Sequence, residues 1–398
     1  MPANRKMPYH CRISCRTGLL MSLIFLIILS CKSRKEPGVI TINPLNLTER
    51  EVRLSDFTDD MTYIPVDNEI LFQHPNRIET TEELFIMATF PTGVKVFDRK
   101  GKFRNRIGAR GRGPGEYHTS GSDFTIDRNN GLIYILDRKN IIVYNFRGLF
   151  IKEFSIEEFD SYFTDIQFQD GKIYLAGFRE MGFAKYDWLV IDTLGNLIAK
   201  KKNHVPGFLT GLGARGGFFL SNANLHYWNN YNDTIFVIHE DDHYPLIFIE
   251  QGDFREPTED YPLEDFLKYF RIYNIIGSQK YLFLRYHYDH LFHEASVNIE
   301  NGNLSLFGKS EISPFNYPGI INNLDGGPNF SPSFFYNDNN DNYLIGWVYA
   351  YRLKAHVESE AFRNSTPKYP EKKMKLEELA ASLDENDNPV LMLVKLKN

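Results

Sequence analysis

Cysteine is scarce in this chain, with three copies among 398 residues. Cys11 and Cys15 lie in a basic and apolar N-terminal stretch, and only Cys31 follows that stretch. A chain that loses the stretch by cleavage therefore has no internal disulfide. Packing and strand pairing alone must then hold its core.

Long apolar runs are also scarce, and one lies near the N-terminus at residues 19–29. It is too short to span a bilayer comfortably, and basic residues precede it, so we expect a secretory signal over 1–30. The run ends Ile-Leu-Ser-Cys31, which resembles the lipobox of bacterial lipoproteins. The resemblance implies that Cys31 is acylated and becomes the mature N-terminus. The alternative is an ordinary signal peptide with a chance cysteine.

A positive net charge is missing as well. The chain carries −6, and loss of the four basic residues in 1–30 would change this to −10. An acidic body disfavours nucleic acid as a partner. We expect residues 31–45 to form a lipidated tether, because acyl chains bind a membrane. Residues 32–34, Lys-Ser-Arg, lack the acidic patch expected of surface-exported relatives, which favours the outer membrane with the domain facing the periplasm.

Aromatic residues, in contrast, are abundant: Tyr and Phe number 23 and 32, which suits strands. A unit of two apolar strands around a polar turn occurs three times between residues 94 and 200. Its turn glycines, Gly101, Gly148 and Gly195, are 47 residues apart. An equal period of this length predicts radial repeats of about one four-stranded sheet each, which is a β-propeller.

Six short apolar strands, each after a polar turn, predict six blades over residues 46–398. They lie at 84–87, 132–136, 173–176, 225–228, 281–284 and 343–347. Helical spacing of apolar residues predicts two inserted amphipathic helices, at 261–276 and 371–383. The apolar C-terminal end, NPVLMLVKLKN, is expected to close the ring by pairing with an N-terminal strand.

Several stretches together resemble the six-bladed β-propeller lipoprotein family of Bacteroidota, which is distantly similar to NHL-type propellers. The resemblance covers roughly residue 50 to the end, and the lipobox agrees with it. It implies the fold and a place in the cell envelope, and it brings no established catalytic residue. The stretches are GRGPGEY at 111–117, FTIDRNNGLIYILD at 124–137, YNDTIFVI at 231–238, NNLDGGPNFSP at 322–332 and NPVLMLVKLK at 388–397.

Loops on one face of a propeller often line its central opening, so we predict a ligand pocket there. Its candidate residues are Arg112, Glu116 and Tyr117 in one glycine-rich loop and Asp325 in another. The alternative is turn chemistry alone, since the first loop lacks the ending and context of a phosphate loop.

Two charged clusters invite a functional and a structural interpretation. Lys100, Lys102, Arg104 and Arg106 share one side of a strand, and could meet an acidic glycan or phosphorylated ligand or simply form a solvated edge. The histidines at 285–294 could hold a metal, but their spacing places them on opposite strand faces. We therefore predict no metal site and no cofactor.

No serine, histidine and acid arrangement, HExxH pattern or Walker loop announces an enzyme. The sequence thus favours a non-catalytic, membrane-anchored lipoprotein whose propeller face binds a glycan, peptide or protein. The alternative is a propeller enzyme, a hydrolase or lyase acting on a sugar or lactone at the channel mouth, since the fold hosts many activities.

Overall fold

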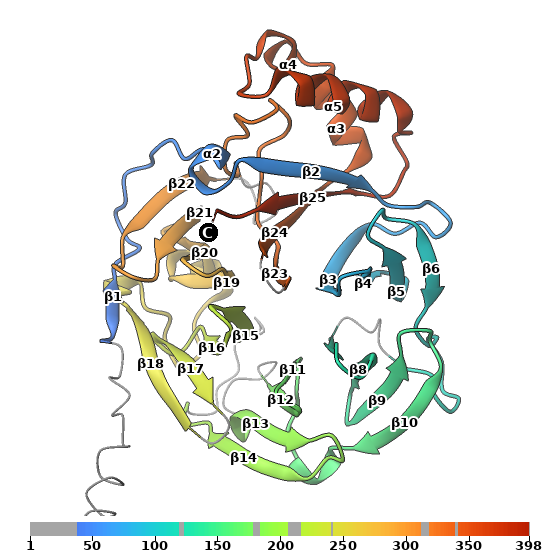
Figure 1. The fold of residues 1–398 in the computed structure, drawn as a ribbon. Helices are drawn as coiled ribbons and strands as arrows, with labels where there is room; N and C mark the ends of the chain where they lie inside the picture. The colour runs from blue at the N-terminus through green and yellow to red at the C-terminus, as the bar shows by residue number, and fades with distance from the viewer. Residues whose placement is uncertain are drawn as a thin grey trace, which may run out of the picture. The chain divides into compact units, whose positions relative to one another are not determined.

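A computed structural model describes residues 38–118, 123–177, 184–205, 216–239, 242–311, 318–338 and 341–397. They form a six-bladed β-propeller, in which six small sheets surround a central axis (Figure 1). This architecture confirms the predicted fold. Among the described residues, no helix is long and apolar enough to cross a membrane.

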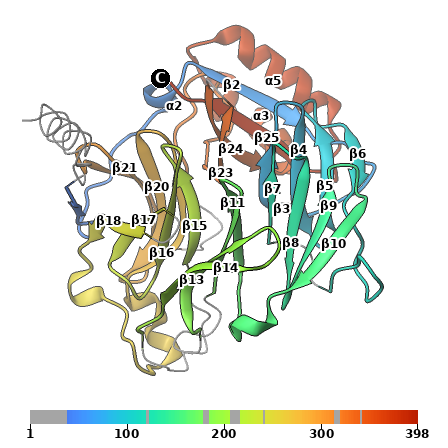
Figure 2. The same cartoon turned by 60° about the horizontal axis from the view of Figure 1, so that its bottom comes forward.

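Blades 1, 2 and 3 are four-stranded antiparallel sheets in which the first strand of each blade lies nearest the axis (Figures 1 and 2). Blade 1 contains β3 (His74–Thr80), β4 (Leu84–Phe90), β5 (Gly93–Asp98) and β6 (Phe103–Arg106). Blade 2 contains β7 (Phe124–Asp127), β8 (Leu132–Asp137), β9 (Asn140–Asn145) and β10 (Phe150–Ser155). Blade 3 contains β11 (Asp165–Gln169), β12 (Lys172–Ala176), β13 (Tyr186–Asp192) and β14 (Leu197–Lys202).

Blades 4 and 5 follow the same plan, but blade 4 gains a fifth strand from the N-terminal side. Blade 4 contains β15 (Gly216–Ser221), β16 (Asn224–Asn229), β17 (Thr234–His239) and β18 (Asp242–Ile249), and β1 (Ile40–Ile42) pairs in parallel with β18. Blade 5 contains β19 (Arg271–Gly277), β20 (Tyr281–Tyr288), β21 (Leu291–Asn298) and β22 (Leu304–Ser310). β1 thus joins the propeller ahead of residue 46, where the sequence placed its start.

Blade 6 closes the ring with strands from both ends of the chain. Its order is β23 (Phe334–Asp338), β24 (Asp341–Val348), β25 (Val390–Lys395) and β2 (Asp60–Pro65). β25 pairs antiparallel with β2 over six residues, from Asp60 opposite Lys395 to Pro65 opposite Val390. This confirms the predicted closure, which leaves the C-terminal strand with a partner on each side.

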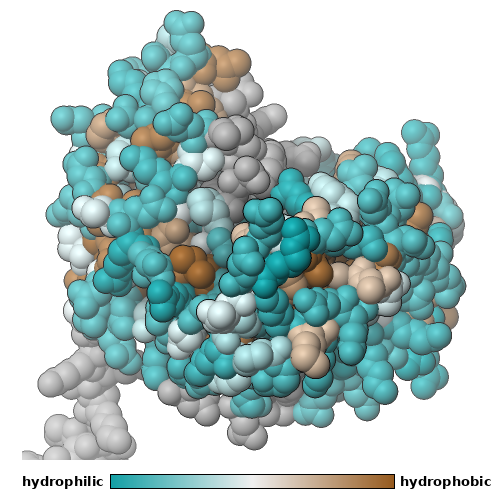
Figure 3. All heavy atoms as spheres, turned by 90° about the horizontal axis from the view of Figure 1, so that it is seen from above, coloured by the Kyte–Doolittle hydropathy of each residue, from teal (hydrophilic) through white to brown (hydrophobic). Residues whose placement is uncertain are grey.

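Helices lie mainly between β24 and β25, on the outside of blade 6 (Figure 1). They are α3 (Ala350–Val357), α4 (Glu360–Asn364) and α5 (Pro370–Ser382), and a short α2 (Leu54–Phe57) precedes β2. Leu353, Phe362 and Leu376 bury their side chains in the same core as Val390 and Met392. The outer surface on this side is mostly hydrophilic, with separate apolar spots (Figure 3). The observed α5 confirms the helix predicted at 371–383.

The other predicted helix, at 261–276, is wrong. The structure has a short 3-10 helix, η3 (Leu263–Lys268), and then β19, the innermost strand of blade 5. Another 3-10 turn, η2 (Gly252–Phe254), precedes it, and η1 (Glu157–Phe159) lies between blades 2 and 3. Helical spacing of apolar residues across the boundary produced the error. The β-branched Ile272, Ile275 and Ile276 in fact pack into the blade.

The 47-residue period is confirmed in the turns between the third and fourth strands. Gly101, Gly148 and Gly195 have φ of +83°, +83° and +96°, a backbone conformation that favours glycine. A Cβ at Gly148 would also lie 2.4 Å from the carbonyl oxygen of Arg106 in the preceding blade. The glycine therefore permits close contact between neighbouring blades.

Candidate functional site in the central channel

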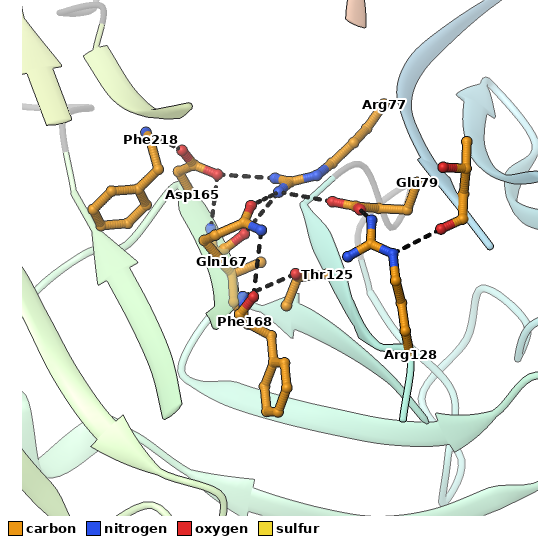
Figure 4. Close-up of polar contacts among 10 residues, drawn as sticks. Arg77, Glu79, Thr125, Arg128, Asp165, Gln167, Phe168 and Phe218 are labelled. Carbon is orange, nitrogen blue, oxygen red and sulfur yellow. Dashed lines mark hydrogen bonds and ion pairs between the residues drawn. The ribbon is translucent and has the colours of Figure 1, made fainter. Parts of the chain in front are cut away.

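Four side chains from the innermost strands of blades 1 and 3 meet near the axis (Figure 4). Alternate residues of a strand share a face, so Arg77 and Glu79 of β3 project together, as do Asp165 and Gln167 of β11. The residues between them, Ile78 and Ile166, are buried in the blade cores. We call Arg77, Glu79, Asp165, Gln167 and the nearby Arg128 the axial cluster.

Arg77 is the centre of the axial cluster. Its Nη1 donates to Asp165 Oδ1 at 2.9 Å, and its Nη2 donates to Gln167 Oε1 at 2.8 Å and to the carbonyl oxygen of Ile166 at 2.9 Å. Burial alone would lower the pKa of Arg77, but the negative charges of Asp165 and Glu79 outweigh it, and the pKa is raised. One cation therefore links blade 1 directly to blade 3.

Asp165 is also bound by blade 4, through its second oxygen. Oδ2 accepts a hydrogen bond from the backbone N–H of Phe218 at 2.7 Å, and Oδ1 accepts one from the N–H of Ile166 at 2.8 Å. Gly217 makes this approach possible: its φ is +147°, and a Cβ there would lie 2.5 Å from Oδ2. Both carboxylate oxygens are thus engaged.

Glu79 is shared by two arginines. Its Oε1 lies 3.4 Å from Arg77 Nη2, and its Oε2 lies 3.1 Å from Nη2 of Arg128, the residue after β7. Arg128 Nε also donates to the carbonyl oxygen of Thr80 at 2.8 Å. The axial cluster therefore joins blades 1 to 4, and its acids hold the two arginines and the backbone N–H groups in position.

Three of the predicted site residues lie together in the loop between β6 and β7. Tyr117 is buried, and its hydroxyl donates to the carbonyl oxygen of Ile107 at 3.2 Å. Glu116 accepts a hydrogen bond from the N–H of Gly113 at 2.8 Å, which closes the turn. Arg112 is exposed. Burial, the largest effect, raises the pKa of Tyr117.

Asp325, the fourth predicted residue, lies beside blade 6. It is 1% exposed, and its Oδ1 accepts hydrogen bonds from Asn322 Nδ2 at 2.6 Å and from the N–H of Gly327 at 2.8 Å. Tyr63 of β2, the outermost strand of that blade, lies 3.3 Å away. Burial raises the pKa of Asp325. Its hydrogen-bond partners therefore belong to blade 6 and the loop beside it, whereas those of Glu116 and Tyr117 belong to the loop between β6 and β7.

A second buried charge cluster lies where the loop after blade 4 meets blade 5. Glu256 Oε1 accepts hydrogen bonds from Tyr261 at 2.6 Å and from Arg271 Nη1 at 2.9 Å, and Tyr231 lies 3.3 Å away. Oε2 of Glu256 has no hydrogen-bond partner within the described part of the chain. Burial outweighs the arginine and raises the pKa of Glu256. Neither this cluster nor the axial one was predicted.

Of the basic residues predicted on one strand face, Arg104 and Arg106 lie on β6 and are exposed, while Phe103 and Asn105 are partly covered. Lys100 and Lys102 lie in the turn between β5 and β6, so that half of the prediction is wrong and only the two arginines share a strand face. His287 and His293 are buried in the β20–β21 hairpin. Across the described ranges, no group of three or more His, Cys, Asp or Glu side chains could hold a metal ion.

Fold and axis together define this molecule as a six-bladed β-propeller with an axial ion-pair network. A family model for a domain of unknown function, DUF4934, matches residues 37–395, and the chain belongs to that family. No curated protein matches the chain.

Comparison with solved structures finds similar chains at low sequence identity, of which the first shares the fold. A Bacteroides fragilis protein whose name suggests export has a TM-score of 0.63 and 18% identity, covering 90% of this chain and all of that one. A Bacteroides thetaiotaomicron protein of unknown function has a TM-score of 0.42 and 7% identity, covering 87% and 75%. U3-55K has a TM-score of 0.46 and 11% identity, covering 84% and 98%.

Proposed function

We propose that this chain is an envelope lipoprotein, anchored through Cys31, whose propeller face binds a ligand without chemically changing it. The lipobox-like ending of the N-terminal apolar run supports the anchor. The similarity to a Bacteroides fragilis protein whose name suggests export is consistent with this location. We favour the outer membrane with the propeller in the periplasm, as the tether sequence predicts.

The axial cluster is the observation that carries the proposal for binding. Its acids are held by Arg77, Arg128 and backbone N–H groups, so the inner strands of four blades are tied together. Such cross-links hold the inner strands of these blades as a fixed platform, and a preorganised platform loses little freedom on binding. Of the four predicted contacts, the exposed Arg112 is the one we propose to touch the ligand.

A propeller enzyme is the second candidate, and Glu256 favours it. A buried carboxyl group with a raised pKa is a common feature of catalytic acids. Glu256→Gln separates the two candidates: it abolishes turnover in an enzyme of this kind and leaves binding unchanged in a binding protein.

The test uses the mature chain with Cys31 replaced by serine. Arrays of oligosaccharides, peptides and envelope proteins measure binding, and a panel of chromogenic glycosides and lactones measures turnover. We expect saturable binding that Arg112→Ala weakens, with no turnover. Turnover of a substrate that Glu256→Gln abolishes, without binding on any array, would reject the proposal.

A further inference from the structure

We propose that a row of aromatic side chains at the junction of blades 1 and 6 is a glycan-binding site. This inference rests on the proposed binding function and names its ligand class. We call Phe90, His74, Trp347, Tyr349 and Tyr351 the aromatic strip. No residue of the strip was among the predicted contacts.

The strip is continuous from blade 1 to blade 6. His74 of β3 stacks on Phe90, its register partner in β4, with centroids 5.6 Å apart, and on Trp347 of β24 at 6.1 Å. Trp347 contacts Tyr349 edge-on at 4.9 Å, and Tyr349 stacks on Tyr351 at 5.3 Å. The five rings therefore make a continuous chain of ring contacts from blade 1 to blade 6.

The strip is open to solvent at both ends. Phe90 and Tyr351 are 43% and 45% exposed, and the three rings between them are partly exposed. Covering exposed aromatic surface with an apolar partner removes it from water, which lowers the free energy of the complex. A row of such rings on one surface therefore indicates a binding site rather than isolated exposed side chains.

Polar groups accompany the rings and select the kind of partner. Arg352 lies over Tyr349 and Tyr351, with its guanidinium carbon 5.6 and 5.9 Å from their centroids, and its Nε donates to the Tyr351 hydroxyl at 3.2 Å. A purely apolar partner would bury the charged Nη groups of Arg352 without offering them a hydrogen-bond acceptor, which is costly. A sugar ring has apolar C–H faces and hydroxyls at its rim, so it satisfies both.

The strip lies on the same face of the propeller as the entrance to the axial cluster. His74 is the first residue of β3, as Asp165 is the first residue of β11, and Phe90 is the last residue of β4. The loops that enter the innermost strands form this face. A glycan lying along the strip would thus occupy the platform that the axial cluster holds in place.

The test compares three exposed aromatic residues in the mature chain with Cys31 replaced by serine. On an array of defined neutral and acidic oligosaccharides, followed by titration of the best one, we expect Phe90→Ala and Tyr351→Ala each to weaken binding about tenfold. Phe248→Ala is the matched control, because Phe248 is 39% exposed on β18 of blade 4. It should change affinity less than about twofold.

Melting temperatures show whether each variant is folded. Tryptophan fluorescence, to which Trp347 and the buried Trp188 and Trp228 contribute, gives a second measurement and is expected to shift when an oligosaccharide binds the parent chain. Oligosaccharide binding that both strip variants retain would overturn the glycan site and leave the proposed function standing. The same holds if the chain binds only peptides, or only phosphatidylethanolamine vesicles. Substrate turnover without any binding overturns both.

Discussion

Gly217 lies at a position where a side chain would be unfavourable, because of both its backbone conformation and its contact with Asp165. Its φ of +147° and the 2.5 Å that a Cβ would leave to Asp165 Oδ2 both oppose a side chain. We expect Gly217→Ala to lower the free energy of unfolding by about 2–4 kcal/mol, from backbone strain plus the damaged axial cluster. Urea denaturation measures the change.

Gly171→Ala is the matched control, because Gly171 also has a positive φ, +76°, but nothing within 4 Å of its Cβ position. It should lose only about 1–2 kcal/mol of unfolding free energy, from backbone strain. Equal losses in the two variants would mean that the contact with Asp165 contributes nothing.

At the scale of single residues, the sequence predicted little of the site. Arg77 and Asp165 are 88 positions apart, and each belongs to an alternating pattern that any exposed strand edge could carry. Their partnership depends on the closure of the ring, which brings the innermost strands of blades 1 and 3 together at the axis, and no local pattern records this. Tyr117 and Asp325 attracted attention as polar loop residues, yet their described contacts are those of buried turns.

At the scale of elements, β25 is the strand on which ring closure depends. Its residues Val390 to Val394 are all buried, and each large apolar side chain contributes roughly 1.5–3 kcal/mol. Their sum is comparable to the stability of a whole domain, about 5–15 kcal/mol. A chain that ends at residue 389 should therefore lose cooperative thermal unfolding and become sensitive to proteases.

A chain that ends at residue 397 is the control for this truncation, because it keeps β25 and the bond from the N–H of Lys397 to the carbonyl oxygen of Phe57. Its melting temperature should equal that of the full chain. A cooperative transition in the shorter chain would show that blade 6 does not need its third strand.

Elements were more predictable than residues, because a propeller repeats. All six predicted apolar strands exist, as the second strand of each blade, since a buried strand between two others is apolar throughout. The error at 261–276 arose where an insertion precedes blade 5 and interrupts the period. The first strand of that blade, β19, therefore had no turn at the expected distance to mark it.

At the scale of the whole molecule, buried histidines predict sensitivity to acid. Burial lowers the pKa of His226, His287 and His293 from 6.5 to about 4. Between these values the unfolded chain binds protons that the folded chain does not, so stability is present above pH 6.5 and lost as the pH falls toward 4. Burial raises the pKa of Asp187 to about 6, which acts in the opposite direction.

His226→Gln isolates one of these protons. Between pH 6 and pH 5, the fall in unfolding free energy should become smaller by about 1.4 kcal/mol per pH unit, measured by urea titration. Above about pH 7.5 the imidazole of His226 is neutral in both the folded and the unfolded chain, so the slopes of the parent and the variant should coincide there, which is the control. A slope that His226→Gln does not alter would contradict a buried neutral imidazole.

The proposed anchor at Cys31 is also tested at the scale of the whole molecule. We expect Cys31→Ala to abolish incorporation of labelled palmitate and to move the chain from the membrane fraction to the soluble fraction, since acyl chains supply the membrane affinity. Cys15→Ala, within the predicted signal, should change neither. Membrane association that survives Cys31→Ala would mean that another contact holds the protein there.

The parallel pairing of β1 with β18 decides where a pull on such an anchor would act. Only nine residues separate Cys31 from Ile40, a reach of about 30 Å when fully extended. A force on the proposed anchor would act first on β1, at the outer edge of blade 4, and not on the β2–β25 pairing that closes the ring in blade 6. With Cys31 as the proposed anchor, β1 would stay within about 30 Å of the acylated residue, and rotation of the propeller about this tether would be restricted.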